Sequence, residues 1–131
     1  MLRATLKVQR ITTCDKLLAA AGHFNDRAAL AQSARLDLDQ LTGLVRQADL
    51  ARVQGVGVVF GSMLADLGVG DVGALAQQEP NKLHERLRLL NESDGVARRS
   101  PTAAEVTDWI AQARRLPGLV TYASRGKEAA R

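Results

Sequence analysis

Aromatic side chains are scarce in this sequence. Its 131 residues include one Trp, one Tyr and two Phe, together 3% of the chain, although 46% of all residues are hydrophobic. A core must therefore be filled mainly by Leu, Val and Ala, and Leu and Ala favour helices. Runs of β-branched residues, which favour strands, are absent as well. The composition predicts an all-α fold, a compact bundle of about six or seven short helices.

Cysteine is limited to one residue, Cys14. A lone cysteine excludes an intramolecular disulfide framework, and with only His23 and His84 beside it the chain lacks the ligands of a zinc site. We therefore expect no metal and no other cofactor. The same scarcity favours a reducing, cytoplasmic location.

Long apolar runs are missing too. No run approaches the roughly 20 residues that span a bilayer, so we expect no membrane segment. Residues 1–7 lack the apolar centre of a signal peptide. The sequence shows no Ser/His/Asp grouping, no paired carboxylates and no Gly-rich loop followed by Lys. These absences predict a non-enzymatic binding module without an evident small-molecule substrate.

The charge is basic overall but unevenly distributed. The net charge is +4 and the isoelectric point about 9.8, as in many nucleic-acid-binding proteins. Residues 1–40 carry six basic and four acidic groups, and residues 82–131 carry ten basic and six acidic groups. Residues 41–81 carry two basic groups against four acidic ones. The positive charge therefore lies towards the two ends of the sequence.

The length predicts one compact domain over residues 11–122, preceded by a segment 1–10 and followed by a flexible basic tail 123–131. Residues 1–10 alternate weakly and fit an extended strand or a frayed helix. Helical spacing and capping signals then predict helices over about 12–21, 25–34, 38–51, 58–67, 72–76, 80–91 and 103–116. The strongest signals are capping boxes that start at Asp37 and Thr102, whereas Asn25 is the expected cap of the helix over 25–34.

Two glycines, Gly55 and Gly57, lie between two of these helices. A Gly-Val-Gly turn allows positive φ angles and a close approach of the backbone, both of which a Cβ disfavours. Such a turn is the centre of a helix-hairpin-helix, in which amides at a helix N-terminus can bind a phosphate. The alternative is a tight connection without any ligand.

A short internal repeat accompanies the turn. Residues 11–18 align with residues 69–76 at an offset of 58, with an apolar residue before a helix cap in both copies. The caps are Thr13 and Asp71. The alignment pairs Cys14 with Val72, so we interpret Cys14 as a small buried hydrophobic residue.

Together these features carry a family resemblance. The matching segments are 48–57, 67–77, 80–83, 90–92, the Arg98-Arg99 pair with Pro101, and 106–113. Over roughly residues 11–122 the chain resembles a bacterial family of tandem helix-hairpin-helix proteins, itself a domain of unknown function. The resemblance implies SAM-like, stacked hairpin units, similar to the DNA-gripping domains of repair enzymes and polymerases.

Two partner classes remain open. For sequence-independent binding of nucleic acid, the candidate residues are Arg52, Gly55, Val56, Gly57, Arg98 and Arg99. A DNA-gripping hairpin usually has a cation after its second glycine, however, and here Val58 and Val59 follow. Three successive bulky residues, Val58, Val59 and Phe60, cannot all face inward on a helix, because neighbours point about 100° apart. They are therefore candidates for a protein contact, and Trp109 is interpreted as core.

Overall fold

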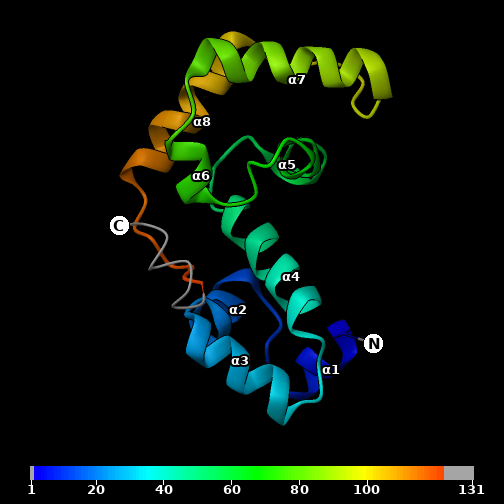
Figure 1. The fold of residues 1–131 in the computed structure, drawn as a ribbon, viewed down its shortest axis with the longest axis vertical. Coiled ribbons are helices and arrows are strands. Elements are labelled where there is room, and N and C mark those ends of the chain that lie inside the picture. The colour runs from blue at the N-terminus through cyan, green and yellow to red at the C-terminus, as the bar shows by residue number, and fades with distance from the viewer. Residues whose placement is uncertain (1, 123–131) are drawn as a thin grey trace. The chain divides into compact units, whose positions relative to one another are not determined.

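The computed structural model describes residues 2–122, and these residues form eight helices and no strand (Figure 1). The helices are α1 (Leu2–Val8), α2 (Cys14–Ala21), α3 (Phe24–Ser33), α4 (Leu38–Leu50), α5 (Gly57–Asp66), α6 (Val72–Ala76), α7 (Pro80–Asp94) and α8 (Ala103–Arg115). The predicted all-α fold is confirmed. The additional helix is α1, which forms where the sequence suggested an extended or frayed segment. The predicted tail, residues 123–131, lies outside the described residues.

The helices divide between two units. Among the described residues, the first unit comprises residues 2–49 together with 118–122, and the second comprises Leu50–Pro117. The expected domain 11–122 thus spans most of both units, and α1 lies in the expected segment 1–10.

The first unit is built from α1 to α4. Its core is formed by aliphatic side chains of all four helices, namely Leu6, Leu17, Leu18, Ala21, Ala31, Leu41, Val45 and Ala48. Val120, from the segment that follows α8, packs against this cluster. The first unit is therefore completed by residues distant in the sequence.

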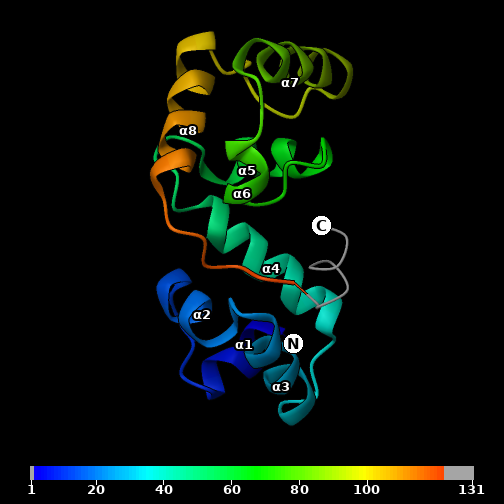
Figure 2. The same ribbon diagram turned by 60° about the vertical axis from the view of Figure 1, so that its left-hand side comes forward.

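The second unit is built from α5 to α8. Helix α8 packs against α6 and α7, and α5 packs against α7 (Figure 2). Buried residues of all four helices and of the turn before α5 form one cluster, with Leu64, Leu75, Leu83, Leu87, Val106, Trp109 and Ile110 among them. Trp109 is buried, which confirms its predicted place in the core.

The two units repeat the same local structure. The amide of Ile11 bonds to the carbonyl of Leu6 at 2.8 Å, and the amide of Val69 bonds to that of Leu64 at the same distance. The caps of the following helices correspond as well: Thr13 accepts from the amide of Lys16, and Asp71 from that of Ala74. Helices α4 and α8 correspond at an offset of 65, which pairs the buried residues Leu41 with Val106, Val45 with Ile110, and Ala48 with Ala113. The short repeat seen in the sequence therefore belongs to a four-helix pattern that occurs twice.

The repeat does not extend to Cys14, whose side chain is exposed, whereas Val72 is buried. The prediction of a buried Cys14 is wrong. Cys14 is the first residue of α2, beyond the end of the buried face that begins at Leu17. The helix end is not covered there, so helical spacing alone does not bury it.

Side chains cap most helix starts. Asp37 accepts from the amides of Asp39 and Gln40, and Thr102 and Glu105 form a reciprocal capping box, so both predicted starts are confirmed. The predicted cap Asn25 is wrong: the cap of α3 is His23, whose Nδ1 accepts from the amide of Asn25 at 3.2 Å. Histidine can do this because a neutral imidazole nitrogen is an acceptor.

Candidate functional site at the glycine turn

The turn between α4 and α5 consists of two consecutive tight bends. The amide of Val53 bonds to the carbonyl of Leu50 at 3.0 Å, and that of Val56 to the carbonyl of Val53 at 3.4 Å. Val53 and Val56 are buried in the core of the second unit. Val56, a candidate binding residue, therefore anchors the turn rather than exposing its side chain.

Both glycines adopt the left-handed conformation that the sequence suggested. Gly55 has φ of +95° and Gly57 has φ of +65°. A Cβ on Gly55 would lie 3.1 Å from Nε1 of Trp109, whereas a Cβ on Gly57 would meet nothing within 4 Å. Gly55 is thus required for conformation and for packing, and Gly57 for conformation alone.

Helix α8 holds the turn through Gln112. The amide of Gln54 donates to Oε1 of Gln112 at 2.8 Å, and Nε2 of Gln112 donates to the carbonyl of Gln54 at 3.0 Å. Nε2 also donates to Asp108 at 2.8 Å, which fixes the orientation of the amide. This role of Gln112 is not predictable from the sequence, because nothing in the local pattern relates it to a residue 58 positions earlier.

Among the helices whose preceding residue is described, α5 is the one that starts without a side-chain cap. Its N-cap residue, Val56, makes no side-chain capping bond, and its first turn contains no acidic residue. The first amides of a helix have no partner within the helix, and the helix dipole adds partial positive charge there. The side chain of Val58 is 90% exposed, so this first turn faces solvent. The geometry is that of a helix start without a side-chain cap and open to solvent.

Two of the charged candidates, Arg52 and Arg99, are engaged within the second unit. Nη2 of Arg52 donates to the carbonyl of Pro117 at 2.6 Å. Arg99 makes a two-bond ion pair with Glu105, at 2.6 and 3.0 Å, and its guanidinium lies 5.6 Å from the ring centre of Phe60. Both guanidinium groups therefore help to hold the unit together.

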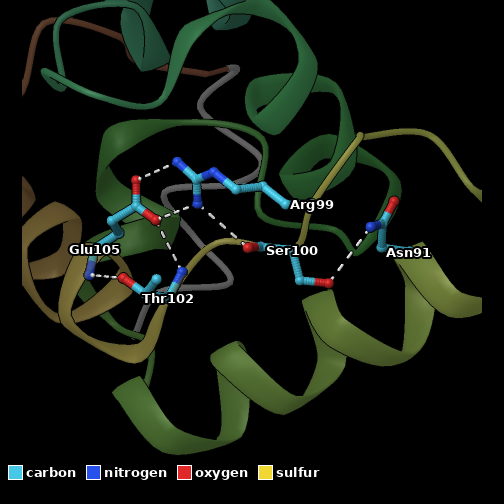
Figure 3. A network of polar contacts seen from close by, with 5 residues as sticks. All are labelled: Asn91, Arg99, Ser100, Thr102 and Glu105. Carbon is cyan, nitrogen blue, oxygen red and sulfur yellow. Dashed lines mark hydrogen bonds and ion pairs between the residues drawn. The ribbon is translucent and has the colours of Figure 1, made fainter.

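The ion pair of Arg99 belongs to a network that orders the connection between α7 and α8 (Figure 3). Glu105 also accepts from the amide of Thr102, and Asn91 donates to Ser100 at 3.4 Å. The hydrogen bonds from Arg99 and from the Thr102 amide lower the pKa of Glu105 to about 2. The partner carboxylate in turn raises the pKa of Arg99.

Arg98 differs from its neighbour. It is exposed, and within residues 2–122 its side chain has no hydrogen bond or ion pair. Of the candidate cations, Arg98 is the one whose charge is available to a ligand.

Other arginines of the second unit bind backbone carbonyls at helix ends. Arg86 donates to the carbonyl of Leu67 at 2.7 Å, just after α5, and Arg114 donates to those of Ala76 and Gln78 at 3.1 and 3.4 Å, at the end of α6. Helix C-termini carry partial negative charge, which such cations complement. Much of the basic character of this unit is therefore structural.

The three successive apolar residues divide between surface and core. Val58 and Val59 are exposed, by 90% and 45%. Phe60 is partly buried and packs on Trp109, with ring centres 5.4 Å apart. The sequence predicted at least one exposed residue among the three, and two are found.

Within residues 2–122, no cluster of three or more His, Cys, Asp or Glu side chains is placed to hold a metal ion. None of the helices in this part of the chain has the length and apolar character needed to cross a membrane.

Fold and turn together define a class: an all-α chain in which a four-helix pattern occurs twice, with a glycine turn before the second copy. The chain belongs to the family described as Domain of unknown function (DUF4332), whose family model matches residues 2–116. This match covers all eight helices and every candidate residue of the turn. Comparison with curated proteins found no match. Comparison with solved structures found none either.

Proposed function

We propose that the chain is a non-enzymatic helix-hairpin-helix module that binds the phosphate backbone of nucleic acid without sequence preference, in the cytoplasm. The observation that carries the proposal is the start of α5. This helix begins at the second left-handed glycine, Gly57, and has no side-chain cap. Amides at such a helix end bind an anion through geometry and through the dipole. The resemblance to bacterial tandem hairpin proteins adds an argument by analogy.

The proposed contact has two parts. The first-turn amides of α5, at Gly57, Val58 and Val59, hold one phosphate, and Arg98 supplies a cation that has no hydrogen bond or ion pair within residues 2–122. Phosphate contacts position a protein on nucleic acid but carry no sequence information. Because few cations are available, we expect modest affinity that falls with salt.

Exchanges at Val58 test this proposal without disturbing the core, because its side chain is 90% exposed. Val58→Lys is expected to tighten binding of a mixed-sequence duplex and Val58→Glu to weaken it, each by roughly tenfold at low salt. Matched controls are Val8→Lys and Val8→Glu, which introduce the same charges at an exposed valine in α1. Fluorescence anisotropy over a salt series measures both pairs.

Two results would contradict nucleic-acid binding through this turn. One is the absence of binding by the natural chain to duplex and single strands at low salt. The other is equal affinity of the two Val58 variants. If the Val8 pair changes affinity as much as the Val58 pair, the contact is a general charge effect and not the start of α5.

A protein contact is the second candidate, because Val58 and Val59 are two successive exposed apolar residues, and Phe60, which follows them, packs on the buried Trp109. Neighbouring exposed apolar side chains can form part of an interaction surface. Here both Val58→Lys and Val58→Glu are expected to abolish binding of a protein partner, whereas the two charges act in opposite directions on a phosphate. The direction in which Val58→Lys changes the affinity therefore distinguishes the two candidate functions.

A further inference from the structure

Residues 119–122 form a segment that follows α8 in the sequence and binds the first unit. It is not helical (Figure 1). Gly22, at the end of α2, permits its approach, because a Cβ there would lie 2.3 Å from the carbonyl oxygen of Leu119. Val120 packs against the apolar cluster of the first unit. The segment therefore has a fitted docking site.

Thr121 is recognised through each of its polar groups. Its amide donates to the carbonyl of Gly22 at 3.0 Å, and its hydroxyl accepts from the amide of Phe24 at 2.8 Å. Its carbonyl accepts from Nη2 of Arg27 at 2.8 Å. Thr121 thus makes two hydrogen bonds through its backbone and one through its hydroxyl. Proteins recognise bound peptides through contacts of these kinds.

Tyr122 extends the recognition by one residue. Its ring centre lies 5.6 Å from the guanidinium carbon of Arg27 and 5.7 Å from that of Arg46. Two cations against one aromatic ring form a specific, partly desolvated contact. The docking site thus selects an apolar residue, a threonine and an aromatic residue in succession.

Arg27 links this site to the fold of the first unit. It is 1% exposed, and its Nη1 donates to the carbonyls of Ala21 and Gly22 at 3.0 and 2.8 Å. Its Nε donates to Thr42 at 3.0 Å. The carbonyl of Thr121 is the acceptor for the third nitrogen, Nη2, of this buried guanidinium. Loss of an acceptor for a buried charged group is costly. The stability of the first unit therefore depends on a bound segment of this sequence.

We propose that a second copy of this chain can supply the segment, so that the protein forms an exchanged dimer. The segment is joined to the second unit through Pro117, whose carbonyl is held by Arg52 at 2.6 Å, and the next residue is Gly118, where an added Cβ would meet nothing within 4 Å. A glycine at this point permits the chain to leave in another direction. When two copies exchange their segments, every contact of the segment with a first unit is preserved. The free-energy cost of the exchange is therefore only that of bringing two chains together. This proposal does not rest on the function of the glycine turn.

Complementing variants of the full chain test the proposal. Arg27→Met damages the docking site and keeps the segment, whereas Thr121→Gly with Tyr122→Gly damages the segment and keeps the docking site. Mixed, they are expected to form a one-to-one dimer, in which the intact segment of one chain occupies the intact site of the other. The single, exposed Cys14 accepts a donor or an acceptor dye, so energy transfer and sedimentation report the dimer. The control mixes either variant with a chain that carries all three exchanges.

A second arm uses the natural sequence alone. Natural chains labelled at Cys14 are expected to show energy transfer that grows with concentration. A peptide of residues 118–122 is expected to compete, and the same peptide with Val in place of Thr121 to compete roughly tenfold less well. The proposal is overturned if natural chains show no energy transfer at the highest soluble concentration. It is also overturned if the transfer is insensitive to the peptide, or if helical, stable variants stay monomeric when mixed.

Discussion

Single residues of the turn show how a glycine pattern can have two separate physical causes. Gly55 and Gly57 both have positive φ, but only Gly55 lies against a side chain, that of the buried Trp109. We expect Gly57→Ala to lower the free energy of unfolding by about 1 kcal/mol, the usual cost of a left-handed alanine. Gly55→Ala is expected to cost at least 1 kcal/mol more, because the indole must move.

Urea unfolding followed by circular dichroism measures both exchanges. Gly43→Ala, in the exposed middle of α4 where a Cβ meets nothing, is the matched control and is expected to stabilise the chain by about 0.5–1 kcal/mol. Equal losses at Gly55 and Gly57 would show that the contact with Trp109 does not determine the cost.

At the scale of elements, the start of α8 depends on one carboxylate. Glu105 receives bonds from Arg99 and from the amide of Thr102, and its pKa is lowered to about 2. A carboxyl with a lowered pKa stabilises the folded state above its ordinary pKa, and this contribution is lost as the pH falls from about 4.5 to about 2. We expect a loss of about 1 kcal/mol in that range, the usual contribution of an exposed ion pair that also caps a helix.

Glu105→Gln separates this effect from general acid unfolding. The variant is expected to be less stable at pH 7 by about 1 kcal/mol, and its deficit relative to the natural chain is expected to disappear between pH 4.5 and pH 2. Glu92→Gln, in the last turn of α7, is the control for removal of one carboxylate that binds a different arginine, Arg88. A deficit that stays constant with pH would contradict the assignment to Glu105.

Elements with local causes were predictable from the sequence. The cap at Asp37, the capping box at Thr102 and the positive φ angles of the glycines in the turn follow from interactions within a few residues, and each was found; the reciprocal bond from Gln40 that a capping box at Asp37 would add was not. Helix α1 was harder to predict, because Leu2 to Val8 alternate as in a strand, while Leu6 is buried by packing in the first unit. Packing overrides a weak local pattern.

Contacts between distant residues were not predictable. Gln112 holds Gln54 across 58 residues, and Arg27 binds Thr121 across 94. A single sequence carries no signal for such pairs, because each residue is ordinary in its own helix or loop. The same reason explains why the arginines looked available for phosphate, although Arg99 pairs with Glu105.

At the scale of the whole molecule, the repeated pattern gives each unit a core of its own. Leu41 is fully buried in the first cluster and Leu83 in the second, and no residue belongs to both clusters. Leu→Ala at either position leaves a cavity and is expected to cost about 2–5 kcal/mol. Because proteins open locally in cooperative units, we expect each substitution to destabilise mainly the unit that contains it.

Hydrogen exchange measured by mass spectrometry should show that Leu83→Ala reduces protection in α5 to α8 by at least tenfold more than in α1 to α3. Leu41→Ala should show the reverse. Equal loss of protection throughout residues 2–122 in both variants would instead mean that the two cores unfold as one, and that the repeat is a pattern of structure without independent stability.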